Sequence, residues 1–537
     1  MESNTLYYGD NLLVLREHIP DNSVDLIYLD PPFNSSRTYN VLFKDETGLD
    51  AEAQVAAFED TWHWNQATQA TYYDLVTQAP ERLGQMVGAL YTAVGPNQMM
   101  AYLVMMAARL LELHRTLKPT GSLYLHCDPT ASHYLKIILD TIFGPQNFRN
   151  EIVWKRTTAH NDPARWGKIH DTILFYSKTS AYTWNNVYTE YEEDYKSRYN
   201  RIDPDGRKWT DDNLTAKGLA GGGYTYEYKG SVSLWRLPLD TMKRLDEENR
   251  LYFTSNGGIR LKRYLDEMPG RSVQSVITDI PPINSQAAER LGYPTQKPLE
   301  LLERIVQASS NTGDVVLDPF CGCGTTVAAA QKLGRRWIGI DITHLAIALQ
   351  KYRLKEMFPD AAFDVVGEPT TLGAAQQLAQ DDRHQFEWWA LSLIKARPVG
   401  AQAGSKQGKK GADQGIDGVM SFIDDASNKP KRALVQVKSG KVSSSQIRDL
   451  VGTVKREKAQ MGIFITLEEP TAPMLKEAAT AGFYQSPGFN RAYPTIQIFT
   501  IKQLLAGTAV DMPASNVTFK QAGKVKGDGA EQLTLLK

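Results

Sequence analysis

An apolar run that ends in a carboxylate and two prolines constrains the first half of this chain more than any other feature. Val24–Leu29 is almost wholly apolar, which is typical of a buried parallel strand. Asp30, Pro31 and Pro32 follow at once, and proline can neither donate to a sheet ladder nor continue a helix. The strand therefore ends here, with Phe33 directly after the turn. In open α/β sheets, ligands bind at this carboxyl edge.

The residue types in this turn suit the exocyclic amino group of a nucleobase. The Asp30 carboxylate and the Pro31 carbonyl would accept its two hydrogens and return electron density to its nitrogen, while Phe33 stacks on the base. A base inside a duplex must first be flipped out, at a cost on the order of a few kcal/mol. The alternative interpretation is a proline turn without a chemical role.

Composition narrows the class of protein. A chain of 537 residues is too long for one core, so we expect two to four domains. The formal net charge of -1 means that any nucleic-acid surface must be local. Three cysteines (Cys127, Cys321, Cys323) cannot form a disulfide framework, and Cys321 and Cys323 lack further ligands at zinc spacing. With no signal sequence and no long apolar run, we expect a cytoplasmic protein without membrane segments.

Strands and helices alternate through the first 150 residues. We expect strands at 6–10 and 122–127, and helices at 12–18 and 97–117. Together with the strand before Asp30, these segments resemble successive βα units. The pattern predicts an α/β fold.

A second candidate ligand site has the order strand, glycine turn, helix, strand. Its strand ends at Asp318, its turn carries Gly322 and Gly324, its helix starts near Thr325, and the next strand delivers Asp341. A Gly-x-Gly turn lets a ligand approach the backbone, and an acid at the next strand end suits ribose hydroxyls. The third glycine of pyrophosphate binders is missing, which favours a nucleoside over NAD. A purely structural crossover is the alternative.

Basic and aromatic residues interleave without a clear period from about 150 to 282. Examples are Trp154-Lys155-Arg156, Arg165-Trp166 and the segment 191–199. Such side chains hold phosphates and stack on bases. An ordinary inserted subdomain with a solvated face is the alternative interpretation.

Three motifs, in this chain order, resemble the amino-group DNA methyltransferases of the beta arrangement. They are Asp30-Pro-Pro-Phe33, Tyr293-Pro-Thr-Gln-Lys-Pro298 and Asp318-Pro-Phe-Cys-Gly-Cys-Gly324. The resemblance covers roughly residues 5–355 and implies a doubly wound, mostly parallel sheet of the methyltransferase type. It also implies double-stranded DNA as substrate and S-adenosylmethionine as cofactor.

The resemblance further assigns roles to individual residues. The catalytic residues are Asp30, Pro31, Pro32 and Phe33. The cofactor-binding residues are Lys297, Pro298, Asp318, Phe320, Gly322, Gly324, Thr325 and Asp341. The segment 150–282 falls where this family carries its target-recognition region. An acidic first motif residue goes with N6 of adenine in the family and serine with N4 of cytosine, so Asp30 favours adenine, with N4 of cytosine as the alternative.

The residues after about 368 exceed what a methyltransferase core needs. We expect a helix at 382–395 that carries Glu387, and a later strand that carries Gln436 and Lys438. Because strand side chains alternate with period two, Gln436 and Lys438 share one face. A local basic stretch surrounds them: Lys431, Arg432, Lys438, Lys441, Arg448, Lys455, Arg456 and Lys458. Such a stretch suits a phosphate backbone.

With Asp417, which stands beside the preceding strand, these residues resemble the Mrr-like branch of the PD-(D/E)xK nucleases. The resemblance implies that Asp417, Gln436 and Glu387 hold Mg²⁺, and that Lys438 orients or activates the attacking water. The alternatives are a solvated αβ face, or a domain that binds DNA or a partner without cutting.

These observations divide the chain into four parts. Residues 1–149 are the catalytic part of a methyltransferase, 150–282 its target-recognition region, 283–367 its cofactor-binding part, and 368–537 a nuclease or DNA-binding domain. The sequence thus predicts a DNA adenine-N6 methyltransferase fused to an endonuclease, a restriction-modification activity in one chain. We expect it in the cytoplasm, associated with a bacterial or phage nucleoid; a homodimer is compatible with the sequence.

Overall fold

The computed structural model describes most of the chain. The described residues are 3–32, 37–44, 50–60, 64–157, 164, 166–216, 223–284, 287, 289, 291, 293, 295–399, 416–425 and 429–513. Phe33 and residues 400–415 lie outside them. The chain divides into two compact units, Asn186–Gln274 and the remainder.

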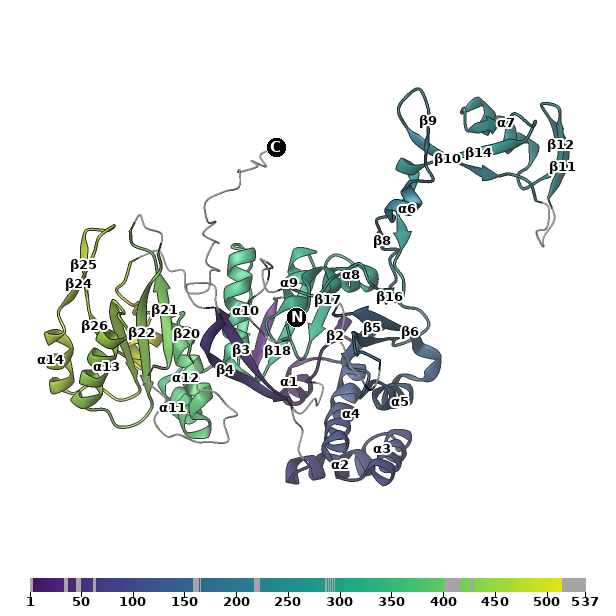
Figure 1. Ribbon diagram of the computed structural model, residues 1–537. Helices are drawn as coiled ribbons and strands as arrows, with labels where there is room; N and C mark the ends of the chain where they lie inside the picture. Colours follow the sequence, from purple (N-terminus) through teal and green to yellow (C-terminus); the bar gives the residue numbers. More distant parts are fainter. Residues whose placement is uncertain are drawn as a thin grey trace. The chain divides into compact units, whose positions relative to one another are not determined.

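A nine-stranded sheet forms the centre of the first unit (Figure 1), in the order β16-β6-β7-β5-β2-β17-β18-β1-β19. All neighbours are parallel except β7, which runs antiparallel to β5 and β6. Its strands are β1 (Thr5–Tyr8), β2 (Val24–Leu29), β5 (Leu117–Cys127), β6 (Phe148–Lys155), β7 (His170–Ser177), β16 (Val276–Ile277), β17 (Val315–Asp318), β18 (Arg336–Asp341) and β19 (Asp364–Val366). A separate antiparallel pair joins β3 (Arg37–Lys44) to β4 (Asp50–Asp60).

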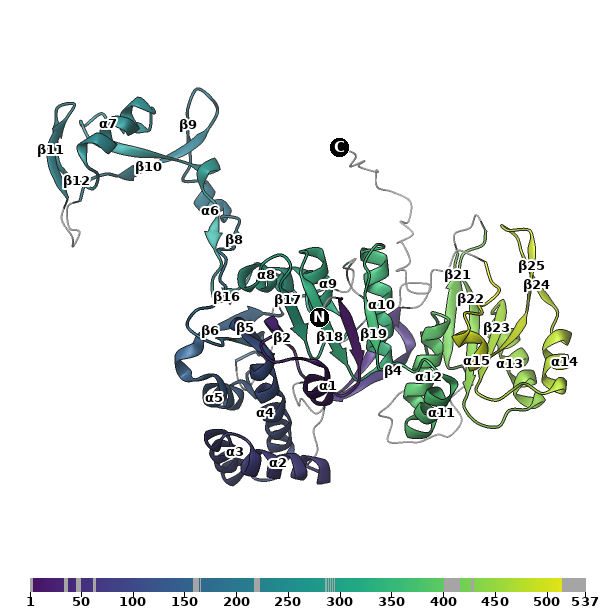
Figure 2. The same cartoon turned by 180° about the vertical axis from the view of Figure 1, so that it is seen from behind.

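Helices cover both faces of this sheet, as Figures 1 and 2 show from opposite sides. One face carries α1 (Asn11–His18), α2 (Gln66–Gln78), α3 (Glu81–Val94), α4 (Gln98–Thr116), α5 (Ser132–Phe143) and the short η1 (Pro145–Asn147); the other carries α8 (Leu299–Ser309), α9 (Thr325–Lys332) and α10 (His344–Met357). Within β2, Ile27 and Leu29 pack into the hydrophobic core on the face that carries α1 to α5, whereas Leu26 and Tyr28 pack into the core on the face that carries α8 to α10. Burial on both faces explains the unbroken apolar run. The expected doubly wound α/β fold is confirmed.

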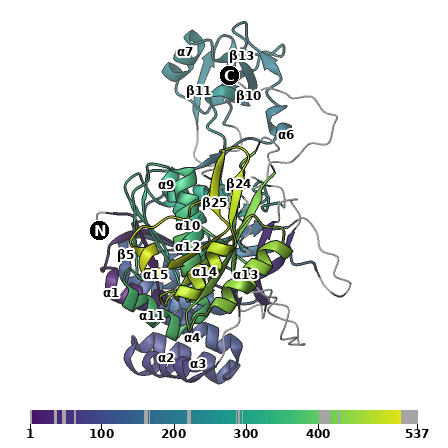
Figure 3. The same cartoon turned by 90° about the vertical axis from the view of Figure 1, so that its left-hand side faces the viewer.

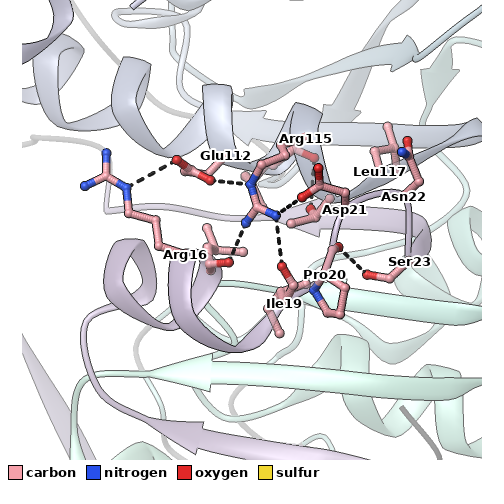
Figure 4. Close-up of polar contacts among 12 residues, drawn as sticks. Arg16, Ile19, Pro20, Asp21, Asn22, Ser23, Glu112, Arg115 and Leu117 are labelled. Carbon is pink, nitrogen blue, oxygen red and sulfur yellow. Dashed lines mark hydrogen bonds and ion pairs between the residues drawn. The ribbon is translucent and has the colours of Figure 1, made fainter. Parts of the chain in front are cut away.

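Arg115 at the end of α4 holds the turn that precedes β2 (Figure 4). Its Nε donates to Glu112 Oε2 at 2.6 Å, its Nη2 to the Leu15 carbonyl at 2.6 Å, and its Nη1 to the Ile19 carbonyl at 3.1 Å. Nη1 also pairs with Asp21. One guanidinium therefore joins α4 to the end of α1 and fixes where β2 begins.

The second unit, Asn186–Gln274, is built mostly from short antiparallel strands. Its elements are β8 (Tyr188–Thr189), α6 (Glu193–Lys196), β9 (Arg201–Ile202), β10 (Lys208–Asn213), β11 (Tyr224–Tyr228), β12 (Ser231–Trp235), α7 (Leu239–Glu247), β13 (Leu251–Phe253), β14 (Ile259–Tyr264), η2 (Leu265–Glu267) and β15 (Arg271–Ser272). The unit is shorter than the region 150–282 expected from the sequence, because β6 and β7 belong to the central sheet.

The carboxyl-terminal domain has its own five-stranded sheet (Figure 3), in the order β20-β21-β22-β23-β26. The strands are β20 (Arg397–Pro398), β21 (Gly418–Phe422), β22 (Lys431–Lys438), β23 (Met461–Thr466) and β26 (Ile496–Thr500), with a hairpin of β24 (Phe483–Ser486) and β25 (Arg491–Pro494) beside them. One face packs on α11 (Leu372–Asp381), α12 (Arg383–Leu393) and α15 (Ile501–Leu505), and the other on α13 (Ser444–Arg456) and α14 (Ala472–Thr480). Within the described part of the chain, no helix has the length and apolar character needed to cross a membrane.

Candidate active sites

A cavity of about 280 Å³ lies at the carboxyl edge of the central sheet. It joins the ends of β1, β2, β17 and β18 to the segment before α8, which are far apart in sequence. Most sequence-predicted residues line it: Asp30, Pro31, Pro32, Lys297, Asp318, Phe320, Gly322, Thr325 and Asp341. Gly324 and Pro298 instead stand at the amino-terminal caps of α9 and α8. The role expected for Phe33 falls outside the described residues.

Asp30 presents one carboxylate oxygen as an acceptor at this cavity. Its Oδ2 accepts a hydrogen bond from Lys297 Nζ, in an ion pair whose side chains are only 14% and 10% exposed. Its Oδ1 is buried and has no hydrogen-bond partner among the described residues. A buried acceptor without a partner is costly, which a donor from a bound ligand would relieve.

The glycine turn after β17 packs too closely on its neighbours to carry side chains. Gly322 and Gly324 have positive φ angles of 49° and 75°. A Cβ at Gly324 would lie 2.7 Å from Gln350 Cγ, and one at Gly322 would lie 3.2 Å from the Tyr293 ring. Gln350 Nε2 donates to the Gly322 carbonyl at 2.7 Å, so α10 supports the turn from behind. Only glycine fits both positions without strain.

The buried carboxyl of Asp318 and the partly buried carboxyl of Asp341 flank this turn. Asp341 Oδ2 accepts from Gly322 N at 2.9 Å, while its Oδ1 accepts from the amide and the hydroxyl of Thr343, each at 2.9 Å. Burial raises the pKa of Asp341 to about 6. Burial also raises the pKa of Asp318, whose Oδ1 accepts from Phe320 N at 3.0 Å, to about 7. The cavity therefore holds carboxyls that titrate near neutrality.

Sequence reasoning missed three further residues of the cavity wall. Arg109 Nη2 lies 3.0 Å from Asp10 Oδ2, and its Nε donates to Asn11 Oδ1 at 2.5 Å. Asn11 Nδ2 in turn donates to the Pro319 carbonyl at 2.7 Å. The signal was the pair Asp10-Asn11 directly after β1, since polar residues at a strand's carboxyl end are ligand candidates. Nothing in the sequence linked Arg109 to them.

Asp417 and Gln436 meet in the carboxyl-terminal domain. Asp417 N donates to the Val435 carbonyl at 2.9 Å, and Asp417 Oδ2 accepts from Val437 N at 2.7 Å, so these two bonds bracket Gln436. The Gln436 side chain is buried, and its Oε1 has no hydrogen-bond partner within the described ranges. Lys438 Nζ lies 3.7 Å from Asp417 Oδ2.

Glu387 on α12 interacts with the same carboxylate. Burial raises the pKa of Glu387, and the charge of Asp417 raises it further. Arg383 Nε, one turn earlier, lies 3.1 Å from Glu387 Oε1. No cluster of three His, Cys, Asp or Glu side chains suited to a metal occurs in the described part of the chain. A cation here would therefore need the amide oxygen of Gln436 besides the two carboxylates, which is a hard-oxygen set of the kind Mg²⁺ accepts.

The basic stretch around β22 is partly neutralised. Lys431 Nζ pairs with Asp424 at 2.6 Å and with Asp425 at 2.8 Å. Arg448 and Arg456 form longer surface pairs with neighbouring glutamates. The positive surface is thus weaker than the count of basic residues suggests.

Comparison with known families identifies both parts of the chain. A family model described as DNA methylase matches residues 24–351. The chain belongs to this DNA methylase family. A second model, described as restriction endonuclease, matches residues 378–485 of the methylase. The resemblance to both families stated from the motifs is confirmed.

Curated relatives of the methylase include restriction-modification proteins. It is 28% identical over 345 residues to the type II methyltransferase M.EcaI of Enterobacter cloacae, covering 63% of this chain and 66% of that protein. It is 31% identical over 352 residues to the Mod subunit of the type III restriction-modification enzyme StyLTI of Salmonella typhimurium, covering 62% of this chain and 50% of that protein. The chain thus spans between half and two thirds of the length of these relatives.

Solved structures similar to the methylase include the cytosine-N4-specific PvuII DNA methyltransferase. That match has 14% identity and a TM-score of 0.34, and it covers 68% of this chain and 95% of the solved chain.

Proposed function

We propose that this methylase transfers a methyl group from S-adenosylmethionine to N6 of adenine in double-stranded DNA. The observation that carries the proposal is Asp30 Oδ1, which has no hydrogen-bond partner among the described residues and lies at the wall of a cavity that Gly322 and Asp341 also line. Asp30 Oδ1 and the Pro31 carbonyl would accept the two hydrogens of the target amino group. This would leave its nitrogen lone pair free for the methyl group.

The residues present fit the cofactor. Gly322 lines the cavity, and without a side chain there a nucleoside could approach the backbone, whereas Gly324 leaves room for Gln350, whose Cγ would lie 2.7 Å from a Cβ. Asp341 Oδ2, which accepts from Gly322 N, would offer a lone pair to a ribose hydroxyl. When bound, the cofactor would supply an electrophilic methyl on a sulfonium and leave as a neutral thioether once that methyl has passed to the target nitrogen. The proton that this nitrogen loses would pass to Asp30, whose Oδ1 accepts its hydrogen bond. Lys297 holds Asp30 in place for that exchange.

Target recognition would involve the unit Asn186–Gln274, which stacks basic side chains on aromatic rings. The Arg201 guanidinium lies 4.2 Å from the Tyr252 ring centre, and Arg207 lies 3.8 Å from that of Tyr264. An adenine flipped out of the duplex would enter the cavity at the edge formed by Pro31 and Pro32.

We also propose that the carboxyl-terminal domain cuts DNA with Mg²⁺. The supporting observation is the buried, unpartnered Oε1 of Gln436 between two backbone contacts of Asp417. Asp417, Gln436 and Glu387 would hold the ion, whose charge would relieve the repulsion between the two carboxylates. Lys438 would orient the attacking water.

Single-molecule sequencing of DNA from a methylation-free bacterial host that expresses the protein tests the first proposal. We expect N6-methyladenine in one short motif, and none with Asp30→Ala. N4-methylcytosine would overturn the choice of base. No mark at all, with the cofactor still bound, would overturn the activity.

Plasmid cleavage by the purified protein with and without Mg²⁺ tests the second proposal. We expect Asp417→Ala and Lys438→Ala to abolish cleavage, whereas Asp449→Ala, at an exposed site on α13, leaves it unchanged. Equal cleavage by all variants would show that the residues that cut DNA are not Asp417 and Lys438. Absence of cleavage by the wild type on both methylated and unmethylated DNA would make this domain a binding module.

A further inference from the structure

A chain of buried polar side chains runs from the cavity into the sheet. Tyr28, which lines the cavity, stands two residues before Asp30. Its hydroxyl lies 2.8 Å from His126 Nδ1, and His126 Nε2 lies 3.1 Å from Asp171 Oδ2. At the far end, Arg156 Nε lies 3.2 Å from Asp171 Oδ1. The order hydroxyl, imidazole, carboxylate links the methyl-transfer cavity to a guanidinium at the surface.

Neighbouring strands hold these side chains rigidly. Tyr28, His126 and Asp171 come from β2, β5 and β7, which are adjacent in the sheet. Their exposed fractions are 2%, 0% and 1%. The residues alternate with side chains of the opposite core, so all three lie on the face that packs on α8. A polar network at this depth is costly unless its members satisfy one another.

The carboxylate of Asp171 determines which atoms donate in the hydrogen bonds that join it to His126 and His126 to Tyr28. Burial alone would raise the pKa of Asp171, but the hydrogen bond to His126 and the charges of Lys297 and Arg156 leave it lowered. An ionised carboxylate only accepts, so His126 Nε2 carries the hydrogen. In a ring that carries a single hydrogen, Nδ1 is then an acceptor, and the Tyr28 hydroxyl donates to it. The remaining lone pairs of Tyr28 Oη can then accept from a ligand in the cavity that Tyr28 lines.

We propose that His126 and Asp171 are positioning residues that keep the Tyr28 hydroxyl oxygen directed at the methyl-transfer cavity as an acceptor. The inference rests on the proposed transfer to an amino group. In that reaction the target nitrogen becomes positively charged, and a fixed oxygen lone pair nearby stabilises the charge without reorganisation. A hydroxyl hydrogen in the same place would repel the positive charge on the target nitrogen and destabilise it.

Arg156 makes one substitution especially informative. An asparagine at position 171 has the size of the aspartate, and its oxygen would remain toward the guanidinium, which can only donate. Its amide nitrogen would then donate to His126 Nε2 and move the imidazole hydrogen to Nδ1. Tyr28 would have to accept that hydrogen and turn its own toward the cavity. Asp171→Asn therefore reverses the direction of the two hydrogen bonds that join residue 171, His126 and Tyr28, without removing them; we call these two bonds the relay.

The test combines Asp171→Asn and Tyr28→Phe in a double-mutant cycle with DNA from a methylation-free host. We expect Asp171→Asn to lower kcat by roughly 10²-fold, with the Kd for S-adenosylmethionine within threefold of wild type. Tyr28→Phe should cost less, and the double variant should match Tyr28→Phe alone, because the tautomer no longer matters without the hydroxyl. The control is Tyr124→Phe, whose hydroxyl meets Ser309 Oγ at 2.7 Å outside the cavity lining.

A second measurement is independent of activity. Nitrogen NMR of the protein with labelled histidine should show His126 protonated at Nε2 in the wild type and at Nδ1 in Asp171→Asn. Independent, multiplicative losses in the cycle would overturn the relay, as would a wild-type His126 protonated at Nδ1 or at both nitrogens. If the wild type transfers no methyl group, the proposed function fails, while the tautomers still decide the relay.

Discussion

Lys297, just before α8, pairs with Asp30 at the end of β2, across a sequence separation of 267 residues. The pair is largely desolvated, with 10% and 14% of the side chains exposed. Removing one member of such a pair leaves an uncompensated charge, which costs more than the pair itself contributes. The carboxylate proposed to hold the target amino group therefore depends on a lysine from another part of the chain.

Lys297→Met should lower the methyl-transfer rate by roughly 10²-fold, because Asp30 loses both its position and its charge partner. Kinetics of methyl transfer to unmethylated DNA measures this. The matched control is Lys118→Met, which breaks the Lys118–Asp25 pair (2.8 Å) at the other end of β2. That variant should lose stability but keep its rate per folded molecule. Equal rate losses in both variants would show that Lys297 affects the rate only by stabilising β2.

Cofactor affinity should fall as the pH drops through about 6. The pKa of Asp341 is raised to about 6 by burial, so below it the carboxyl gains a proton and loses acceptor capacity for a ribose hydroxyl. Well below pH 6, affinity should drop about tenfold per pH unit. Titration calorimetry between pH 5 and 8 measures it. The Asp341→Asn variant should bind the cofactor weakly at every pH and should lack the fall in affinity near pH 6. If that fall is unchanged, its cause is Asp318, whose pKa is raised to about 7.

The same raised pKa values have a consequence for stability without the cofactor. An acid whose folded-state pKa lies above its unfolded value stabilises the fold below the unfolded pKa and loses that contribution as the pH rises through the folded one. For Asp318 and Asp341 the loss falls between about pH 4 and 7. Chemical denaturation of Asp318→Asn should therefore show a shallower decline over this window than the wild type. A parallel decline would contradict it.

Arg115→Met should destabilise the fold by about 2–3 kcal/mol, since two carbonyls lose their donor and a charge-assisted bond to Glu112 is lost. Thermal denaturation measures the change. Arg16 offers a matched control (Figure 4), because its pair with the same Glu112 is at 3.2 Å and its side chain is half exposed. Arg16→Met should cost less than about 0.5 kcal/mol. Similar losses of stability in the two variants would show that the bonds of Arg115 to the Leu15 and Ile19 carbonyls contribute little.

Gln436→Glu should lower the Mg²⁺ concentration needed for cleavage by about tenfold, because a carboxylate replaces a neutral amide among the expected ligands. Without Mg²⁺ the same variant should be less stable than the wild type, since Asp417 and Glu387 already repel each other. Cleavage and unfolding are each followed as Mg²⁺ is titrated. A variant insensitive to Mg²⁺ in both measurements would move the metal away from Gln436.

Many local elements could be predicted from the sequence. Helix 97–117 and the strand before Asp30 were expected nearly where α4 and β2 lie, because periodicity and proline act over a few residues. The glycine turn was also expected, and Gly322 and Gly324 indeed have positive φ. In the carboxyl-terminal domain, the expected strand carrying Gln436 and Lys438 is β22, and the period of two puts both side chains on one of its faces.

The sequence by itself determined which local pieces form and which carboxylates stand at strand ends. Only the tertiary structure decided that Lys297 meets Asp30, that Arg109 meets Asp10, and that Tyr28, His126 and Asp171 form one line. The physical reason is that strand order is set by packing of whole layers, not by neighbouring residues. Once β2, β5 and β7 are adjacent, side chains about 45 to 100 positions apart come within hydrogen-bonding distance.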